Sequence, residues 1–342
     1  MQSCFPDFRA LEFYVVRDVT PSVWQRRIPW AVGLSAAFLI ALTAGVAVFA
    51  GQEGFAAIGR LSGAALALML LLSLVNYSLR AVRWHIFSRR AGCEITFRLS
   101  LLYFISGFAL TLTPGRVGEA FRLYILKRNH GFPFSRTTAI AIADRLSDAA
   151  GLLLLCLLGM ADFLHHAALV ALLCAIFAAP FAVFIAPRQV SRFVLKAIAL
   201  FGPRPRFEAF VCAVAVQIEM IGNWTIYVPM LALSFVGWLA EAAALEVALR
   251  AMGFEMPLFS CGFIFGISAL VGAAVLLPGG MGGTEVSMTG LLLAAGVDFT
   301  TAVAATAVVR LTTLWFAVAL GLALLPVALA MPSHRPQRLQ ET

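Results

Sequence analysis

Charged side chains inside otherwise apolar stretches are the residues of this sequence best able to do chemistry. Arg145 has Asp148 one helical turn after it, whereas Arg310 has no carboxylate within a turn. A charge at the centre of a bilayer costs at least about 2.5–3.5 kcal/mol, so such residues face a partner or the interior of a helix bundle. We expect Arg145 either to pair with Asp148 or to contact a ligand. Arg310 needs a distant carboxylate, such as Glu285 or Glu119, or an anionic ligand, and we expect it to line the functional cavity.

Two proline–glycine motifs carry other candidate groups. The first runs from Pro114 to Arg122 (PGRVGEAFR), and the second runs from Pro278 to Glu285 (PGGMGGTE). Proline stops an incoming helix, and glycine lets the backbone approach another helix or a head group closely. The motifs therefore either break two membrane helices or form ordinary loops at the membrane surface. The residues expected to make the breaks are Pro114, Gly115, Gly118, Pro278, Gly279, Gly280 and Gly282.

Arginines flank Glu119 in the first motif. Arg116 and Arg122 lie on either side of it, and a guanidinium fork matches the oxygens of a phosphate group. An anionic lipid head group is therefore a natural ligand for this motif. The alternative is that Arg122, Lys127 and Arg128 only extend toward the lipid–water interface from an interfacial helix.

Motifs of soluble catalytic sites are absent from the sequence. It has no GxSxG, HExxH or P-loop pattern, and its six cysteines form no CxxC pair. We therefore expect no catalytic residue, no metal site and no cofactor. The formal net charge of +8 comes from basic residues between apolar runs. That distribution is typical of the cytoplasmic loops of a membrane protein, and we expect no nucleic-acid partner.

The composition places the elements that hold these groups in a membrane. Of 342 residues, 61% are apolar and 12% are charged, against about 45–50% and 25% in soluble domains, and the mean hydropathy is +0.93. These values exclude a soluble globular domain and predict an all-α, polytopic membrane protein with six to eight spans. Six full-length transmembrane helices are expected at Pro29–Ala50, Leu61–Arg80, Thr137–Met160, Ala167–Ala186, Thr225–Leu249 and Thr301–Leu329. Two further apolar runs, Leu99–Thr113 and Leu258–Leu277, lead into the proline–glycine motifs.

The basic residues between these runs predict how they are oriented. Leu99–Thr113 would extend for about 22 Å as a helix, short of a hydrocarbon core of roughly 30 Å. If it crossed, the basic segment Pro114–Arg136 would lie outside, against the positive-inside rule. We therefore expect this run to re-enter from the cytoplasm, and Leu258–Leu277 to re-enter from outside, because Pro278–Thr300 has no Lys or Arg. The loop that carries Arg83, Arg89, Arg90 and Arg98 is expected to be cytoplasmic.

This topology predicts one transmembrane domain that contains an inverted repeat. Residues 1–28 and 330–342 are expected to be cytoplasmic, and residues 29–329 form the domain. The repeats cover about 61–160 and about 225–326, and Glu119 precedes Arg145 by 26 residues where Glu285 precedes Arg310 by 25. Inverted repeats with broken helices that meet near the midplane occur in many secondary transporters. We expect the two breaks to meet and to bring Arg145 and Arg310 to a common polar cavity.

The two proline–glycine motifs, together with Asp144-Arg-Leu-Ser-Asp148, resemble a known family. It is the membrane domain of lysylphosphatidylglycerol synthase and its stand-alone, flippase-like relatives, which include hopanoid-associated and archaeal glycosylation-linked proteins. The resemblance covers roughly Leu61–Pro326. It implies a protein that moves a polar lipid between leaflets. With the pairing argument above, it makes the candidate residues of a lipid head-group cavity Arg116, Glu119, Arg122, Arg145, Asp148, Glu285 and Arg310.

Two departures from the family limit what the resemblance implies. The full synthases carry a soluble aminoacyl-transferase domain after the membrane part, and this sequence stops at Thr342. We therefore expect no aminoacylation by this chain and no enzyme activity. The family often has a longer acid directly before the arginine of the third span, where this sequence has Asp144.

Three functional hypotheses remain open on the sequence. The first is an inner-membrane lipid translocator of a bacterium, with cytoplasmic termini and an Arg-lined central cavity. The second is an intramembrane lipid-modifying enzyme or its subunit, and the third is a membrane scaffold for a lipid-biosynthesis enzyme. The expected ligand is a membrane lipid, whether a phospholipid, an aminoacyl-phospholipid, a hopanoid or a glycolipid. A lipid-biosynthesis enzyme is a candidate partner, and the sequence does not predict the oligomeric state.

Overall fold

The structure is a computed structural model that describes residues 51–113, 117–160, 186–200, 205–221, 224–275 and 277–332, apart from a few isolated positions. The segment 1–28, nearly all of Pro29–Ala50 and of Ala167–Ala186, and residues 333–342 lie outside the described residues. So do Pro114, Gly115 and Arg116 of the first motif. Expectations for these parts stay predictions.

Helices make up the regular structure of the described residues, which contain no strand. The first repeat region holds α3 (Gly51–Gly59), α4 (Gly63–Arg90), α5 (Phe97–Ser106), the 3₁₀ turn η2 (Gly107–Leu110), α6 (Val117–His130) and α7 (Phe134–Gly159). Between the regions lie α9 (Pro187–Ala199) and α10 (Pro205–Ile221). The second region holds α11 (Trp224–Ala251), α12 (Leu258–Ala274), η4 (Pro278–Gly280), α13 (Gly283–Ala294), α14 (Phe299–Arg310), η5 (Leu311–Trp315) and α15 (Phe316–Ala330).

Three of these helical segments are long and apolar enough to cross a bilayer. They are Gly63–Arg90, Thr225–Ala251 and Phe299–Ala330, the last running through the π-helical turn η5. Two shorter apolar helices, Phe97–Leu110 and Leu258–Ala274, lead toward the proline–glycine motifs. The prediction of an all-α polytopic membrane protein is therefore confirmed. The expected span Thr137–Met160 forms α7, whose 26 residues include several charged side chains.

The sequence predicted the end of the second span too early. Helix α4 begins after Ser62, whose side chain accepts a hydrogen bond from the backbone N–H of Ala65, and it continues to Arg90. Arg83 is therefore not a loop residue but lies inside the helix with 0% of its surface exposed. Charge alone suggested a loop, whereas tertiary ion pairs let this arginine remain in the helix. Helix α10, which packs on α7, was not predicted at all.

The two regions repeat the same order of helices in opposite directions. Helices α4 and α11 have 28 residues each and begin 161 residues apart, as do α5 and α12. The Arg60 guanidinium, before α4, donates to the carbonyl of Met252, after α11, at 3.4 Å, so the long helices are antiparallel. Asn76 lies against Gly237 where they cross, and these positions are also 161 residues apart. Such a self-matching contact is what a two-fold relation between the repeats produces.

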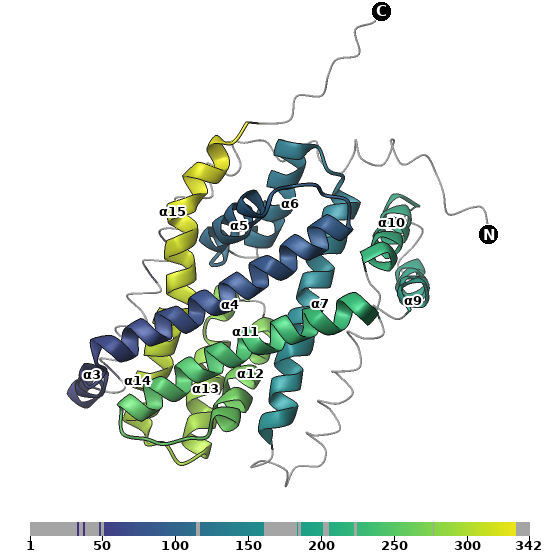
Figure 1. The fold of residues 1–342 in the computed structure, drawn as a ribbon. Coiled ribbons are helices and arrows are strands. Elements are labelled where there is room, and N and C mark those ends of the chain that lie inside the picture. Colours follow the sequence, from purple (N-terminus) through teal and green to yellow (C-terminus); the bar gives the residue numbers. More distant parts are fainter. Residues whose placement is uncertain are drawn as a thin grey trace, which may run out of the picture.

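Each repeat contains a helical hairpin, and the hairpins lie at opposite ends of the molecule (Figure 1). Helices α5 and α6 form one, α12 and α13 form the other, and α4 and α11 run diagonally between them (Figure 1). Helix α7 leads from the first hairpin to pack on α12, and α15 leads back to pack on α5 and η2. Each hairpin is therefore held by the last helix of the other repeat.

Close glycine contacts shape both hairpins. Gly118 lies against the carbonyl of Gly107, and a Cβ on Gly283 would lie 3.3 Å from Cα of Gly272. These two pairs are separated by the same 165 residues, so both hairpins close in the same way. In the second break Gly279 has a φ of 63°, a left-handed conformation that favours glycine. The expectation that glycine permits close backbone approach is met at Gly118.

The tips of the hairpins approach one another inside the molecule. The side chain of Leu112, at the end of the first hairpin's incoming segment, lies against Gly279 in the second break. Leu112 also packs in a buried cluster with Trp315 and Val318. The expected meeting of the two breaks therefore has a structural counterpart in the described residues.

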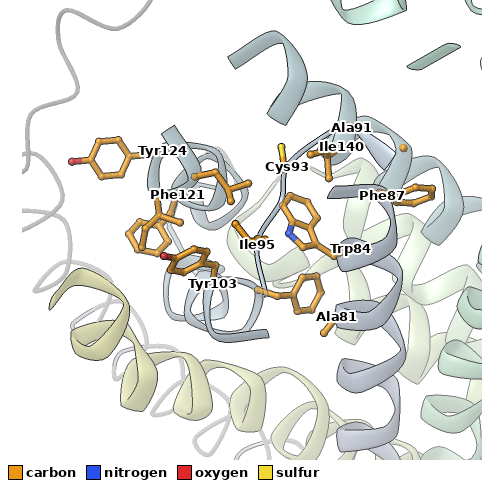
Figure 2. Packing of buried hydrophobic residues seen from close by; sticks show 14 of the residues in the cluster. Ala81, Trp84, Phe87, Ala91, Cys93, Ile95, Tyr103, Phe121, Tyr124 and Ile140 are labelled. Carbon is orange, nitrogen blue, oxygen red and sulfur yellow. The ribbon is translucent and has the colours of Figure 1, made fainter. Parts of the chain in front are cut away.

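An aromatic core fixes the first hairpin against α4. Trp84 and Phe87 of α4 pack with Tyr103 of α5, Phe121 of α6 and Ile140 of α7 (Figure 2). Burying one large apolar side chain stabilises a water-soluble core by about 1.5–3 kcal/mol, but in lipid the gain comes from close packing rather than from leaving water. The rigid aromatic cluster therefore serves to hold the polar side chains of α4, α6 and α7 in register.

Candidate functional site

A buried ion-pair network joins α4 to α7. Arg83 Nε donates to Asp144 Oδ1 at 2.9 Å, and its Nη2 lies 2.8 Å from Asp148 Oδ1. Its Nη1 also donates to the hydroxyl of Ser234 on α11. Arg80 donates to the other oxygen of Asp148 at 2.9 Å. Every charge in this group has an opposite partner, which is the condition for charge to persist inside a membrane bundle.

Arg145 connects this network to the proline–glycine motif. Its guanidinium lies 3.4 Å from Glu119 at the start of α6, 3.4 Å from Asp144 and 3.5 Å from Asp148. The pairing of Arg145 with Asp148 that helical spacing suggested is thus present, although two further carboxylates share the arginine. With 32% of its side chain exposed, Arg145 is the most accessible cation of the network.

Arg122 differs from its neighbours because it has no carboxylate partner within 4 Å among the described residues. Only 3% of it is exposed, and its Nε donates to the carbonyl of Phe104 at 3.1 Å. The guanidinium lies 3.9 Å from the ring centre of Phe104 and 5.6 Å from that of Trp84. Aromatic faces stabilise the cation without neutralising it. Arg122 is buried in protein, so the interpretation that it merely extends to the lipid–water interface is wrong.

A small open cavity lies beside these arginines. It encloses about 170 Å³ of empty space and is lined by Trp84, Glu119, Arg122, Ala141, Asp144 and Arg145. The polar group around it has four arginines and three carboxylates: Arg80, Arg83, Arg122, Arg145, Glu119, Asp144 and Asp148. We call this set the hairpin-one network. It carries one positive charge in excess, and an anion of charge −1 would balance it.

The second repeat holds a separate ion pair. Arg310 Nε donates to Glu285 at 2.6 Å, and its Nη2 donates to the carbonyl of Gly279 at 2.7 Å. Arg310 thus found one of the carboxylates that the sequence offered, and it is only 8% exposed. No hydrogen bond or ion pair between described residues joins it to Arg145, and it does not line the cavity described above. The expected common chamber for both arginines is therefore not seen, because Glu285 already neutralises Arg310.

Sequence reasoning missed three contributors to the site. Arg80 and Arg83 were assigned to a span end and a loop, and Trp84 was not considered. A signal was present, since Asn76, Arg80, Arg83 and Trp84 follow the spacing of one helical face. Asp144 was noted only as a family position, yet it is buried against Arg83. The head-group roles of the sequence-derived candidates remain predictions.

Comparison with known proteins agrees with this architecture. Residues 30–321 match the family described as the lysylphosphatidylglycerol synthase TM region. A UPF0104 membrane protein of Methanothermobacter thermautotrophicus is 26% identical over 281 residues, covering 75% of this chain and 83% of that protein. A UPF0104 membrane protein of Pyrococcus horikoshii is 24% identical over 287 residues, covering 74% of this chain and 84% of that protein. The resemblance drawn from the motifs is confirmed: the chain belongs to the lysylphosphatidylglycerol synthase TM region family.

Proposed function

We propose that this membrane protein translocates a lipid between leaflets, and that Arg122 binds the anionic head group. The observation that carries the proposal is the unbalanced charge of Arg122, buried against aromatic rings beside an open cavity. A buried cation without a counter-charge is costly. A phosphodiester carries one negative charge, which equals the excess charge of the hairpin-one network.

The geometry supports a division of roles among three residues. Arg122 supplies a fixed cation at the inner wall of the cavity, because Phe104 and Trp84 hold its guanidinium plane. Arg145 and Glu119 are about one-third exposed, and their oxygen–nitrogen distance of 3.4 Å is longer than that of the buried pairs. Arg145 is therefore placed to turn from Glu119 to a phosphate oxygen when a head group enters.

The fold supports transport rather than simple anchoring. Two antiparallel repeats with broken helices whose tips meet in the protein are the plan of many secondary transporters. Family membership supports a lipid-related role in a membrane. We also propose the cytoplasmic membrane of a bacterium as the location, with both termini inside, because Lys127, Arg128 and Arg136 flank the α6–α7 turn.

Translocation by purified protein tests the proposal. Proteoliposomes containing fluorescently labelled phosphatidylglycerol should show protein-dependent exchange of the label between leaflets, with no change in lipid mass. Arg122→Gln should reduce exchange at least about tenfold, the loss expected for one charge-assisted contact of roughly 1.5–3 kcal/mol. Arg128→Gln removes the same charge from the same helix outside the cavity, and it should keep the wild-type rate.

Other outcomes identify the competing functions. A change in lipid mass would indicate a lipid-modifying enzyme, and an inactive protein that copurifies with a biosynthetic enzyme would indicate a scaffold. Equal exchange rates in Arg122→Gln and Arg128→Gln, both correctly folded, would remove Arg122 from the site.

A further inference from the structure

A second buried charge-bearing group lies where the repeats cross, outside the hairpin-one network. Glu241 on α11 is one helical turn beyond Gly237, which touches Asn76 of α4. Glu241 is 3% exposed, and its Oε2 accepts a hydrogen bond from Ser73 Oγ at 3.2 Å. In the described part of the chain no Arg, Lys or His nitrogen lies within 4 Å of this carboxyl group.

The surroundings favour the neutral acid over the carboxylate. An ionised carboxylate with a single neutral donor is costly in a low-dielectric interior, whereas the acid needs only ordinary hydrogen bonds. On α4, Tyr77 and Arg80 face this position, but Tyr77 donates to the carbonyl of Thr313 and Arg80 is bound to Asp148. On α7, Asp148 also holds Arg83, and on α14 Arg310 is paired with its own carboxylate. Helix α12 has no charged residue.

We propose that Glu241 is a proton-binding site whose occupancy is linked to anion binding at Arg122. A sodium ion is a poorer fit, because the described residues offer one hydroxyl as a neighbour rather than the several oxygens that a hard cation requires. The link to the lipid rests on the proposed function, whereas the bound proton does not.

Arg80 is the residue that can connect the two sites. It occupies the position in α4 that Glu241 occupies in α11, 161 residues later, and it lies over the ring of Trp238 at 5.2 Å on α11. When the O–H bond of Glu241 breaks, the proton passes to water and the electron pair stays on the carboxylate. The carboxylate then competes with Asp148 for Arg80.

Movement of Arg80 changes the charge beside the cavity. While Arg80 belongs to the hairpin-one network, the network has one excess positive charge and attracts an anion. When Arg80 turns to Glu241, three arginines face three carboxylates and the attraction is lost. Proton binding at Glu241 therefore favours head-group binding, and by linkage head-group binding favours proton uptake.

Binding measurements on the intact protein test the link. In nanodiscs, fluorescent phosphatidylglycerol should bind wild-type protein at least about tenfold more weakly at roughly pH 9 than at roughly pH 6, a coupling of ordinary size. Glu241→Gln mimics the protonated acid, so its affinity should stay at the high value with less than about twofold change. Glu246→Gln, on the same helix and paired with Arg250 at 2.6 Å, should follow the wild type.

Infrared spectroscopy tests the proton without a lipid. At neutral pH the carbonyl band of a protonated carboxyl group should be present in wild-type protein and in Glu246→Gln, and absent from Glu241→Gln. If Glu241→Gln keeps the band, or binds the probe with the pH dependence of the wild type, the inference is wrong. The identity of the ion is wrong if Na⁺ rather than pH changes affinity.

The two proposals fail in different ways. A wild-type protein that binds no probe at any pH would overturn the head-group site and the link, while the infrared band would still report the proton on Glu241. A band that disappears in Glu241→Gln, together with pH-independent binding by the wild type, would overturn the link alone.

Discussion

Arg122 and Arg310 show how surroundings divide two buried arginines into different roles. Arg310 is neutralised by Glu285 at 2.6 Å and also bonds to the backbone of the second break. Arg122 rests on aromatic rings and keeps its charge for a ligand. The first arrangement stabilises a turn of the chain, and the second creates an attraction for anions.

Removing Arg310 should therefore destabilise the protein rather than only impair a site. Arg310→Met leaves Glu285 without a cation and should cost about 3–5 kcal/mol. Arg310→Met combined with Glu285→Met should recover most of that loss, because no uncompensated charge remains. Thermal unfolding in detergent measures both variants.

The control for this cycle is an exposed pair. Arg250→Met breaks the Arg250–Glu246 pair, whose arginine is 69% exposed, and should change stability by about 0.5 kcal/mol or less. Equal losses in the single and double variants at Arg310 and Glu285 would show that the pair does not carry the charge balance.

At the scale of elements, small residues decide how the hairpins close. Gly272 of α12 lies against Thr284 and Gly283 at the start of α13, so a side chain there would push the two helices apart. Gly290, on the same α13, has open space around it. The same residue type is thus required at one position and dispensable at another.

Alanine substitution should separate these two glycines by sign. Gly272→Ala should lower stability, because its Cβ would collide with the side chain of Thr284. Gly290→Ala should raise stability by about 0.5–1 kcal/mol, because alanine restricts the unfolded chain and favours the helix. Thermal unfolding of both variants gives the answer, and a neutral or stabilising Gly272→Ala would contradict the close packing.

The start of α14 carries a pH-dependent cap. Asp298 accepts a hydrogen bond from the backbone N–H of Thr301 at 2.9 Å, and hydrogen bonds from Thr301 lower the pKa of Asp298. A lowered folded-state pKa contributes stability above the unfolded-state pKa of about 3.9, and this stability is lost as pH falls through the folded-state value.

Asp298→Asn should therefore lower the unfolding temperature at pH 7 and make no difference once Asp298 is protonated. Unfolding curves of both proteins between neutral pH and about pH 3 measure this convergence. A constant difference across the range would mean that the charge of Asp298 plays no part in capping α14.

At the scale of the whole molecule, the antiparallel repeats place corresponding turns at opposite ends. The α6–α7 turn at Phe132 belongs to the first hairpin, and the α13–α14 turn near Ala294 belongs to the second. The first is bordered by basic residues and the second is not. The positive-inside rule therefore assigns Phe132 to the cytoplasmic side.

Cysteine labelling should show this opposition. In a cysteine-free background, Phe132→Cys should react with an impermeant maleimide only from the cytoplasmic side, and Ala294→Cys only from the outside. Sealed vesicles of both orientations provide the measurement, with permeabilised vesicles as the control for reactivity. Labelling of both positions from one side would contradict the inverted arrangement.

The sequence by itself determined the membrane class, the long helices and the repeat. Apolar length, Pro and Gly are local signals that act wherever the chain folds, so α11 and α12 were predicted within a few residues. The positive-inside rule failed for Arg83, because its tertiary ion pairs with Asp144 and Asp148 outweigh the cost of a buried charge.

Only the tertiary structure decided which charges meet. Arg310 could reach several carboxylates on the sequence, and the folding of the second hairpin selected Glu285. Arg122 is left without a carboxylate, and Glu241 without a cation within 4 Å, by the way α4, α6 and α11 cross. Pairing of charges depends on distances of a few ångströms between helices remote in sequence, and no local pattern encodes those distances.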